Sequence, residues 1–329
     1  MNIIYFFDPR QSETQLANEI IQSISIDPQD NLVQIDICSD AAIQRTYEGS
    51  TPLIEVGPYH LQWQFSSQEL DVAIRAAKDR LQQVQAGSRE AKRLEKGRAL
   101  SGGDKITYWF GKNYIWVFNG LVFLYLLLPF LAPMFARIGQ TKTASVIYKI
   151  YSPVCHQLAF RSWFLFGEQA YYPRELADIP GIFTYEDISG QSSVDLVRAR
   201  QFIGNDKYGY KVALCQRDVA IYGSILLFGI IFGLSGRKIK PLPWYWWVIL
   251  GMIPIGLDGG SQLPGILFNT IPSWLIERES TPLLRTITGV LFGTTTMWYM
   301  YPLIEETMQG TRAIIATKMA VVTHKNKDI

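Results

Sequence analysis

Four long apolar segments, almost free of charged residues, constrain the fold of this 329-residue chain more than any other feature. A helix rises 1.5 Å per residue, so crossing a hydrocarbon core about 30 Å thick takes roughly 20 apolar residues. We therefore predict four transmembrane helices, over Ile115–Ala136, Val219–Leu234, Pro241–Leu257 and Leu283–Ile304. The second contains Gly223, Gly229 and Gly233, which would let a neighbouring helix approach closely.

Basic residues predict the topology of these segments. They cluster before the first segment, between the second and third, and after the fourth. Short cytoplasmic loops carry the excess of Lys and Arg, and four crossings place all three clusters on one side. A fifth apolar stretch, Ala144–Gly167, is interrupted by Lys149, His156 and Arg161, so we interpret it as interfacial or re-entrant. The prediction is a multi-pass protein of the cell membrane with both termini in the cytoplasm and without a cleavable signal peptide.

The near-zero net charge of +2 hides an uneven distribution. Residues 1–72 hold 2 Lys and Arg against 11 Asp and Glu, whereas residues 73–112 hold 10 against 4. A net charge this small argues against a nucleic-acid partner, and the basic stretch suits the anionic headgroups of a lipid bilayer. We predict a cytoplasmic domain over 1–85, a basic helical connector over 86–112, a membrane domain over 113–305 with an extracytoplasmic loop at 138–211, and a cytoplasmic tail over 306–329.

The N-terminal domain shows a regular alternation of strand and helix patterns. Strands are predicted at Ile3–Phe7, Val33–Cys38 and in LIEVG and LQWQF, and helices at Ser12–Ser23, Ala41–Tyr47 and from Ser67. The order βαβαββα indicates an α/β domain with a small mixed sheet.

The stretch QIDICSDAAIQRTYEGSTPLIEVG, from Gln34, resembles the second half of a glutaredoxin-like thioredoxin fold. The resemblance covers about the first 85 residues and implies a cis proline at Thr51–Pro52. The family's C-x-x-C is replaced by DPRQSET, with Gln11 and Thr14 at the cysteine positions. Without a thiolate this loop has no nucleophile for disulfide exchange. We interpret the domain as a redox-inactive module that docks a protein partner, and we expect Cys38 to be a small buried residue far from the loop.

Under this topology, four polar motifs gather at the outer face of the membrane: CHQLAFRS (Cys155–Ser162), CQRD (Cys215–Asp218), LDGGSQ (Leu257–Gln262) and RESTPLLR (Arg278–Arg285). Ionisable groups at membrane depth are costly and are functional candidates by default. The candidates for acid–base chemistry are His156, Asp218 and Asp258. The candidates for binding an anionic substrate are Arg161, Arg217, Gln262, Arg278 and Arg285.

These four motifs, in this order, resemble predicted membrane proteins known as domain of unknown function 2085. The resemblance runs from about Ile150 to Gly293 and implies no activity. The common second motif is C-x-R-C, and here Asp218 replaces the last cysteine. The chain also carries a polar insert, Glu168–Lys211.

The cysteines leave three alternatives open. Cys155, His156, Cys215 and Asp218 are all acceptable zinc ligands, and exchanging Cys for Asp keeps an anionic ligand. The second alternative is a Cys155–Cys215 disulfide, which an oxidising outer face would permit. The third is two free buried thiols.

The sequence thus predicts an α+β multidomain chain, with a thioredoxin-like α/β domain followed by a polytopic α-helical membrane domain of about four transmembrane helices. Two functions stay open. One is an enzyme acting on a small anionic or lipid-linked substrate at a polar, zinc-binding site. The other is a non-catalytic membrane scaffold or assembly subunit. A concave pocket joining the polar residues would favour the enzyme, and a closed salt-bridge network would favour the scaffold.

Overall fold

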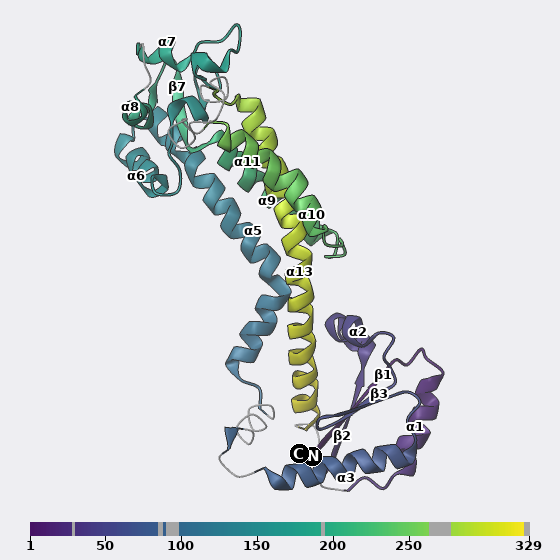
Figure 1. The fold of residues 1–329 in the computed structure, drawn as a ribbon. Helices are drawn as coiled ribbons and strands as arrows, with labels where there is room; N and C mark the ends of the chain where they lie inside the picture. The colour runs from purple at the N-terminus through teal and green to yellow at the C-terminus, as the bar shows by residue number, and fades with distance from the viewer. Residues whose placement is uncertain (28–29, 85–87, 90–98, 192–194, 263–277, 326–329) are drawn as a thin grey trace. The chain divides into compact units, whose positions relative to one another are not determined.

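The computed structural model describes residues 1–27, 30–84, 88–89, 99–191, 195–262 and 278–325. The chain divides into two compact units (Figure 1). Unit 1 comprises Met1–Tyr114 and Glu305–Ile329, and unit 2 comprises Ile115–Ile304. All predicted site residues lie in unit 2. Residues 86–87 and 90–98 of the predicted connector, 86–112, lie outside the described residues, and its last part begins the long helix α5 (Gly102–Arg137).

Unit 1 contains a four-stranded mixed sheet in the order β2-β1-β3-β4. Strand β1 (Asn2–Phe7) pairs in parallel with β2 (Asn31–Asp36) and antiparallel with β3 (Leu53–Val56), which pairs antiparallel with β4 (Tyr59–Gln62). The helices are α1 (Glu13–Ser23), α2 (Ala41–Tyr47) and α3 (Ser67–Gln83). The observed order of elements is the predicted βαβαββα, and the Thr51–Pro52 peptide is cis.

Local sequence explains where these helices begin. Asp40 accepts hydrogen bonds from the backbone N–H groups of Ala42 and Ile43 at the start of α2. Ser66 and Glu69 form a capping box at the start of α3. Such caps satisfy backbone donors that have no partner within the helix.

Each face of the sheet packs against its own set of helices. Residues of α1 and α3, such as Ala17 and Leu70, share a hydrophobic cluster with Tyr5 and Ile54. A second cluster joins Phe6 and other sheet residues to α2 and to Ala316 and Val321. The last two lie in the C-terminal part of α13 (Pro282–Lys325), so residues of the predicted tail complete the core of this unit.

Cys38 corrects one expectation. It lies in the short 3-10 helix η1 (Ile37–Ser39), where its side chain is exposed and its Sγ lies 3.7 Å from Asp8 Oδ1. The predicted burial, remote from the loop after the first strand, is therefore wrong. Parallel strands end at the same edge of a sheet, so residues that follow β1 and β2 become neighbours. The buried side chain of this segment is Ile37.

Unit 2 contains a group of closely packed helices. They are α5 (Gly102–Arg137), α9 (Gln216–Leu234), the consecutive α10 (Trp244–Trp247), η4 (Val248–Met252) and α11 (Ile253–Gly260), and α13. The beginning of α5 and the end of α13 belong to unit 1. Figure 1 shows α9 beside the first part of α13.

Glycines mark the points of closest helix approach. A Cβ on Gly229 of α9 would overlap the Asn119 side chain of α5, and one on Gly233 would lie 3.2 Å from Trp116. Gly251 of η4 meets Thr295 of α13 in the same way. The predicted close approach is thus correct for Gly229 and Gly233. It is wrong for Gly223, where a Cβ would meet nothing within 4 Å.

Two helices among the described residues are long and apolar enough to cross a membrane, Gly102–Arg137 and Gln216–Leu234. They contain the first and second predicted spans. The third predicted span is divided among three short helices, and the fourth forms part of α13, where threonines and tyrosines lower the hydropathy.

The remainder of unit 2 is a small α/β region. It comprises α6 (Thr141–Tyr151), η2 (Ala159–Arg161), β5 (Ser162–Leu165), η3 (Glu175–Ala177), α7 (Tyr185–Ser189), α8 (Leu196–Gln201), β6 (Gly204–Asn205) and β7 (Gly209–Cys215). The strands form an antiparallel sheet in the order β5-β7-β6. Within Ala144–Gly167 the α-helix ends at Tyr151, and the short 3-10 helix η2 then leads into β5. The 11 residues of α6 are about half the length needed to cross a bilayer.

Candidate functional site

The beginning of α9 brings together three of the predicted metal ligands. Strand β7 ends at Cys215, whose Sγ accepts a hydrogen bond from the backbone N–H of Asp218 at 3.4 Å and so caps the helix. Cys155, in the loop after α6, accepts a hydrogen bond at its Sγ from the Cys215 N–H at 3.3 Å. The sulfur atoms of both cysteines and a carboxylate oxygen of Asp218 all lie within 4.8 Å of one another.

The two thiols are not equivalent. A hydrogen bond from the Cys215 thiol lowers the pKa of Cys155, despite burial. The same hydrogen bond, together with burial, raises the pKa of Cys215 well above its usual value. Cys155 is therefore the thiol that ionises first.

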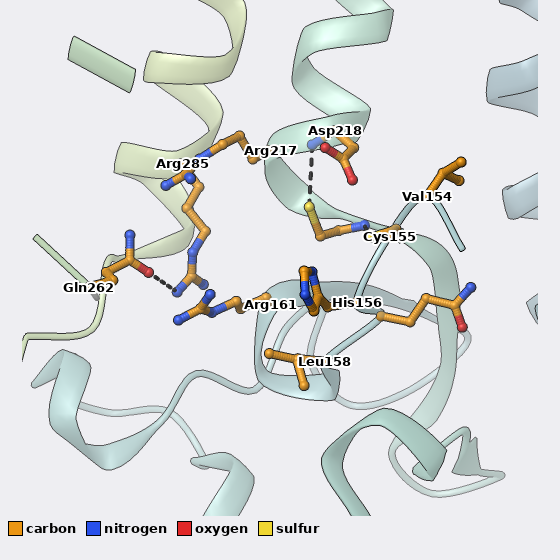
Figure 2. A pocket seen from close by; sticks show the side chains of 11 residues that line it. Val154, Cys155, His156, Leu158, Arg161, Arg217, Asp218, Gln262 and Arg285 are labelled. Carbon is orange, nitrogen blue, oxygen red and sulfur yellow. Dashed lines mark hydrogen bonds between the residues drawn. The ribbon is translucent and has the colours of Figure 1, made fainter. Parts of the chain in front are cut away.

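His156 does not join this group of three. Its side chain is exposed, although it neighbours Cys155 in the chain. It lines a cavity of about 230 Å³ together with Cys155, Cys215 and Asp218 (Figure 2). The predicted four-residue ligand set thus consists of three clustered ligands with an imidazole in the wall of the adjoining cavity.

Three of the predicted arginines, Arg161, Arg217 and Arg285, line the same cavity, as does Gln262. Gln262 accepts a long hydrogen bond of 3.5 Å from Arg285 (Figure 2). The cavity therefore combines thiols, a carboxylate, an imidazole and guanidinium groups.

Glu279 organises the guanidinium groups. Its carboxylate accepts hydrogen bonds from Arg161 Nε at 2.9 Å and Nη2 at 3.0 Å, and it pairs with Arg285. A further arginine, Arg174, lies 3.9 Å away. The side chains of Arg285 and Glu279 are 2% and 5% exposed, so this ion pair is almost fully removed from water.

Asp258 forms a second ion-pair group beside the cavity. It pairs with Arg217 across the α9–α11 contact and lies 3.7 Å from Arg278, which also donates a hydrogen bond to Ser261 Oγ at 2.9 Å. Asp258 is only 3% exposed and is not among the residues that line the cavity. Its contacts identify it as the partner of two arginines, whereas no Lys or Arg of the described residues pairs with Asp218.

Glu279 and Gln216 are parts of the site that sequence reasoning did not assign. Gln216 is fully buried and accepts a hydrogen bond from Arg285 at 3.3 Å. Both lie within motifs that the sequence singled out, directly beside Arg278 and Arg217. The excess of arginines over carboxylates in these motifs was the signal that a further acidic partner was needed.

The apolar helices, with a cluster of ionised side chains at one end of α9, are typical of an integral membrane protein. Comparison with known proteins agrees with this class. Residues 200–299 match the family described as "Predicted membrane protein (DUF2085)". The matched segment includes the second, third and fourth polar motifs, whereas Cys155–Ser162 lies before it.

One relative is similar over a longer part of the chain. An uncharacterized protein of Methanocaldococcus jannaschii is 29% identical over 202 residues, which cover 59% of this chain and 94% of the relative. No solved structure matches the chain. The comparisons thus support a membrane protein and leave the thioredoxin-like resemblance of the N-terminal domain without an independent match.

Proposed function

We propose that the chain is a multi-pass membrane protein with four spans and that the polar site lies on the extracytoplasmic side. The support is the alignment of the segments with α9. Tyr125 of α5 lies against Tyr222, while Trp116 lies against Gly233, so α5 runs antiparallel to α9.

The first part of α13 runs parallel to α9. A Cβ on Gly289 would lie 2.9 Å from Ala220, and Tyr301 stacks on Phe232. Residues 244–260 run antiparallel to α9. Trp247, near their start, donates a hydrogen bond to Thr296 of α13, and Asp258, near their end, pairs with Arg217 at the beginning of α9. If α9 crosses the membrane, then α5, residues 244–260 and the first part of α13, which lie beside it over the same length, cross it too.

Unit 1 is formed by both ends of the chain, which supports an even number of membrane crossings. The C-terminal part of α13 and the N-terminal sheet share one hydrophobic core, which supports a topology with both ends of the chain on one side of the membrane. The basic clusters assign that side to the cytoplasm.

We further propose that Cys155, Cys215 and Asp218 bind a zinc ion. Thiolate and carboxylate are zinc ligands, and zinc sites with three protein ligands leave a fourth position open. The single observation that carries the proposal is the clustering of these three ligand atoms at the wall of a cavity. Two thiolates and one carboxylate would give the zinc site a net negative charge, which Arg161, Arg217 and Arg285 would balance.

This arrangement suits an enzyme that acts on a small anionic or lipid-linked substrate. Arginines bind phosphate and carboxylate groups with two parallel hydrogen bonds. His156 is exposed in the cavity wall, where an imidazole can accept or donate a proton. Bound zinc would supply Lewis-acid chemistry at this position.

The ion pairs favour a second candidate function, the non-catalytic scaffold. The pairs of Glu279 and Asp258 connect η2, α9, α11 and α13, as a lock between helices would. In this alternative, unit 1 is a redox-inactive module that docks a protein partner, and its strand order fits a thioredoxin-like fold.

Metal analysis of the purified full-length protein tests the proposal. We expect stoichiometric zinc in the unmodified protein and in Cys38→Ser, and loss of zinc in Cys215→Ser. Thiols are counted on the same samples under denaturing, non-reducing conditions. If no metal is present and neither Cys155 nor Cys215 is counted as a free thiol, the two cysteines form a disulfide and the zinc site is wrong. Absence of metal with both thiols free would favour the scaffold.

A further inference from the structure

A second cavity, of about 600 Å³, lies between α6 and α8. Its apolar lining comes from Tyr148, Leu158, Leu196, Val197 and Ile203. Leu196 and Val197 are 61% and 62% exposed. Large apolar side chains grouped at the mouth of a cavity commonly mark a ligand or membrane contact.

This cavity adjoins the zinc-site cavity through one short segment. His156, Gln157 and Leu158 line both cavities, one on each side of this segment. Gln157 is buried and held in place: its side-chain amide donates to the Tyr148 carbonyl at 2.9 Å, and its own carbonyl accepts from Lys211 Nζ at 2.8 Å. These hydrogen bonds hold the segment that separates the two cavities in place. A ligand that passes over His156 would contact both cavities.

The charges around the two cavities are predominantly positive. Lys149, Arg200 and Lys211 line the second cavity, which has no carboxylate in its described lining. Burial lowers the pKa of Lys211 to about 7, so the three arginines of the first cavity bring the number of permanent cations to five. Even when the two buried partners, Glu279 and Asp258, are counted with Asp218, only three carboxylates oppose them. A ligand that occupies both cavities would carry negative charge.

The surface beside the second cavity suits contact with lipid. On α6 and in the loop that follows it, Val146, Ile150 and Val154 are more than half exposed. Amphipathic helices of this kind lie in the membrane interface with their apolar side chains toward the acyl chains. With these side chains toward lipid, α6 and the second cavity that it lines would lie at the membrane interface.

We propose that the two cavities together bind one anionic amphiphile of the phospholipid class. Its phosphate lies among the arginines of the first cavity, and one alkyl chain occupies the second cavity between α6 and α8. This inference rests on the proposed anion-binding function and specifies its substrate class.

The test is equilibrium binding of dihexanoyl phosphatidic acid to the full-length protein in a nonionic detergent. Three comparison ligands separate head from chain: dihexanoyl phosphatidylcholine, glycerol phosphate and inorganic phosphate. The main variant is Leu196→Asp, with Val197→Ser as a milder second variant. Leu176→Asp is the matched control, because Leu176 is an exposed leucine of the same region outside both cavities.

We expect phosphatidic acid to bind more tightly than each comparison ligand. Leu196→Asp should weaken this binding about ten-fold, since the contact of one leucine with an alkyl chain is lost. Leu176→Asp should leave it unchanged, and none of the variants should alter the affinity for inorganic phosphate. Equal binding of glycerol phosphate or of phosphatidylcholine would overturn the inference, as would an unaltered affinity in both Leu196→Asp and Val197→Ser.

The zinc content of the same samples decides the metal site separately. Binding that depends on the alkyl chain, in samples without zinc, would support the amphiphile proposal and refute the zinc site. Zinc with chain-independent binding would support the metal and overturn the amphiphile.

Discussion

Replacing Glu279 by Gln tests whether one carboxylate holds the arginines of the site together. The substitution keeps the size of the side chain and removes its charge, leaving Arg285, 2% exposed, without its ion-pair partner. Removing one partner of a buried ion pair costs about 3–5 kcal/mol, because the other charge stays buried. For a unit of this size, that corresponds to a fall in the apparent Tm of roughly 6–20 °C. Tryptophan fluorescence of the purified protein during heating measures it.

Two further variants serve as controls for the Tm shift of Glu279→Gln. Asp206→Asn removes a charge from an exposed pair, Asp206 with Arg137 at 2.9 Å, and should shift the Tm far less because exposed pairs contribute little. Arg161→Gln should fall between the two, because Arg161 is 32% exposed and Glu279 keeps Arg285. If Glu279→Gln were no more destabilising than Asp206→Asn, the assignment of Glu279 as the organising carboxylate would be refuted.

Three other predictions concern helix packing and titration. Gly293→Ala should lower the apparent Tm, since its Cβ would overlap α9, whereas Gly223→Ala should leave it unchanged or raise it, since alanine favours helix; equal effects would contradict the packing. Burial lowers the pKa of Lys211 to about 7. The unfolded chain then binds more protons between pH 7 and 10, so the stability should rise with pH in this range, and less steeply in Lys211→Met. In metal-free protein, iodoacetamide should modify Cys155 at lower pH than Cys215, as peptide mass spectrometry would show; the reverse order would contradict the thiol assignment.

The sequence predicts much of this structure because its signals are local. Strand alternation, helix periodicity and caps such as Asp40 are contained within a few residues, so the element order of unit 1 could be predicted. The meeting of Cys155, Cys215 and Asp218 could be anticipated for a different reason. The predicted even number of crossings would bring separate motifs to one face of the membrane.

What could not be predicted depends on pairings between distant segments. Cys38 becomes a neighbour of Asp8 only because β1 and β2 pair in parallel. Glu279 is one acidic residue among several in the sequence until the loop before α13 places it between two arginines. The absence of a close contact at Gly223, in contrast to Gly229, depends on the rotation of α9, which its composition does not specify.

The ion pair between Arg161 and Glu279 joins residues 118 positions apart in the chain. During synthesis Arg161 is made long before its carboxylate partner, and Arg285 follows that partner by six residues. Arg161 therefore cannot form this pair until Glu279 has been made. In the proposed four-span topology, this pair would form only when the segment that carries Glu279 and α13 inserts beside α9. A truncated protein lacking that segment would expose unpaired arginines, a feature that cellular quality control could recognise.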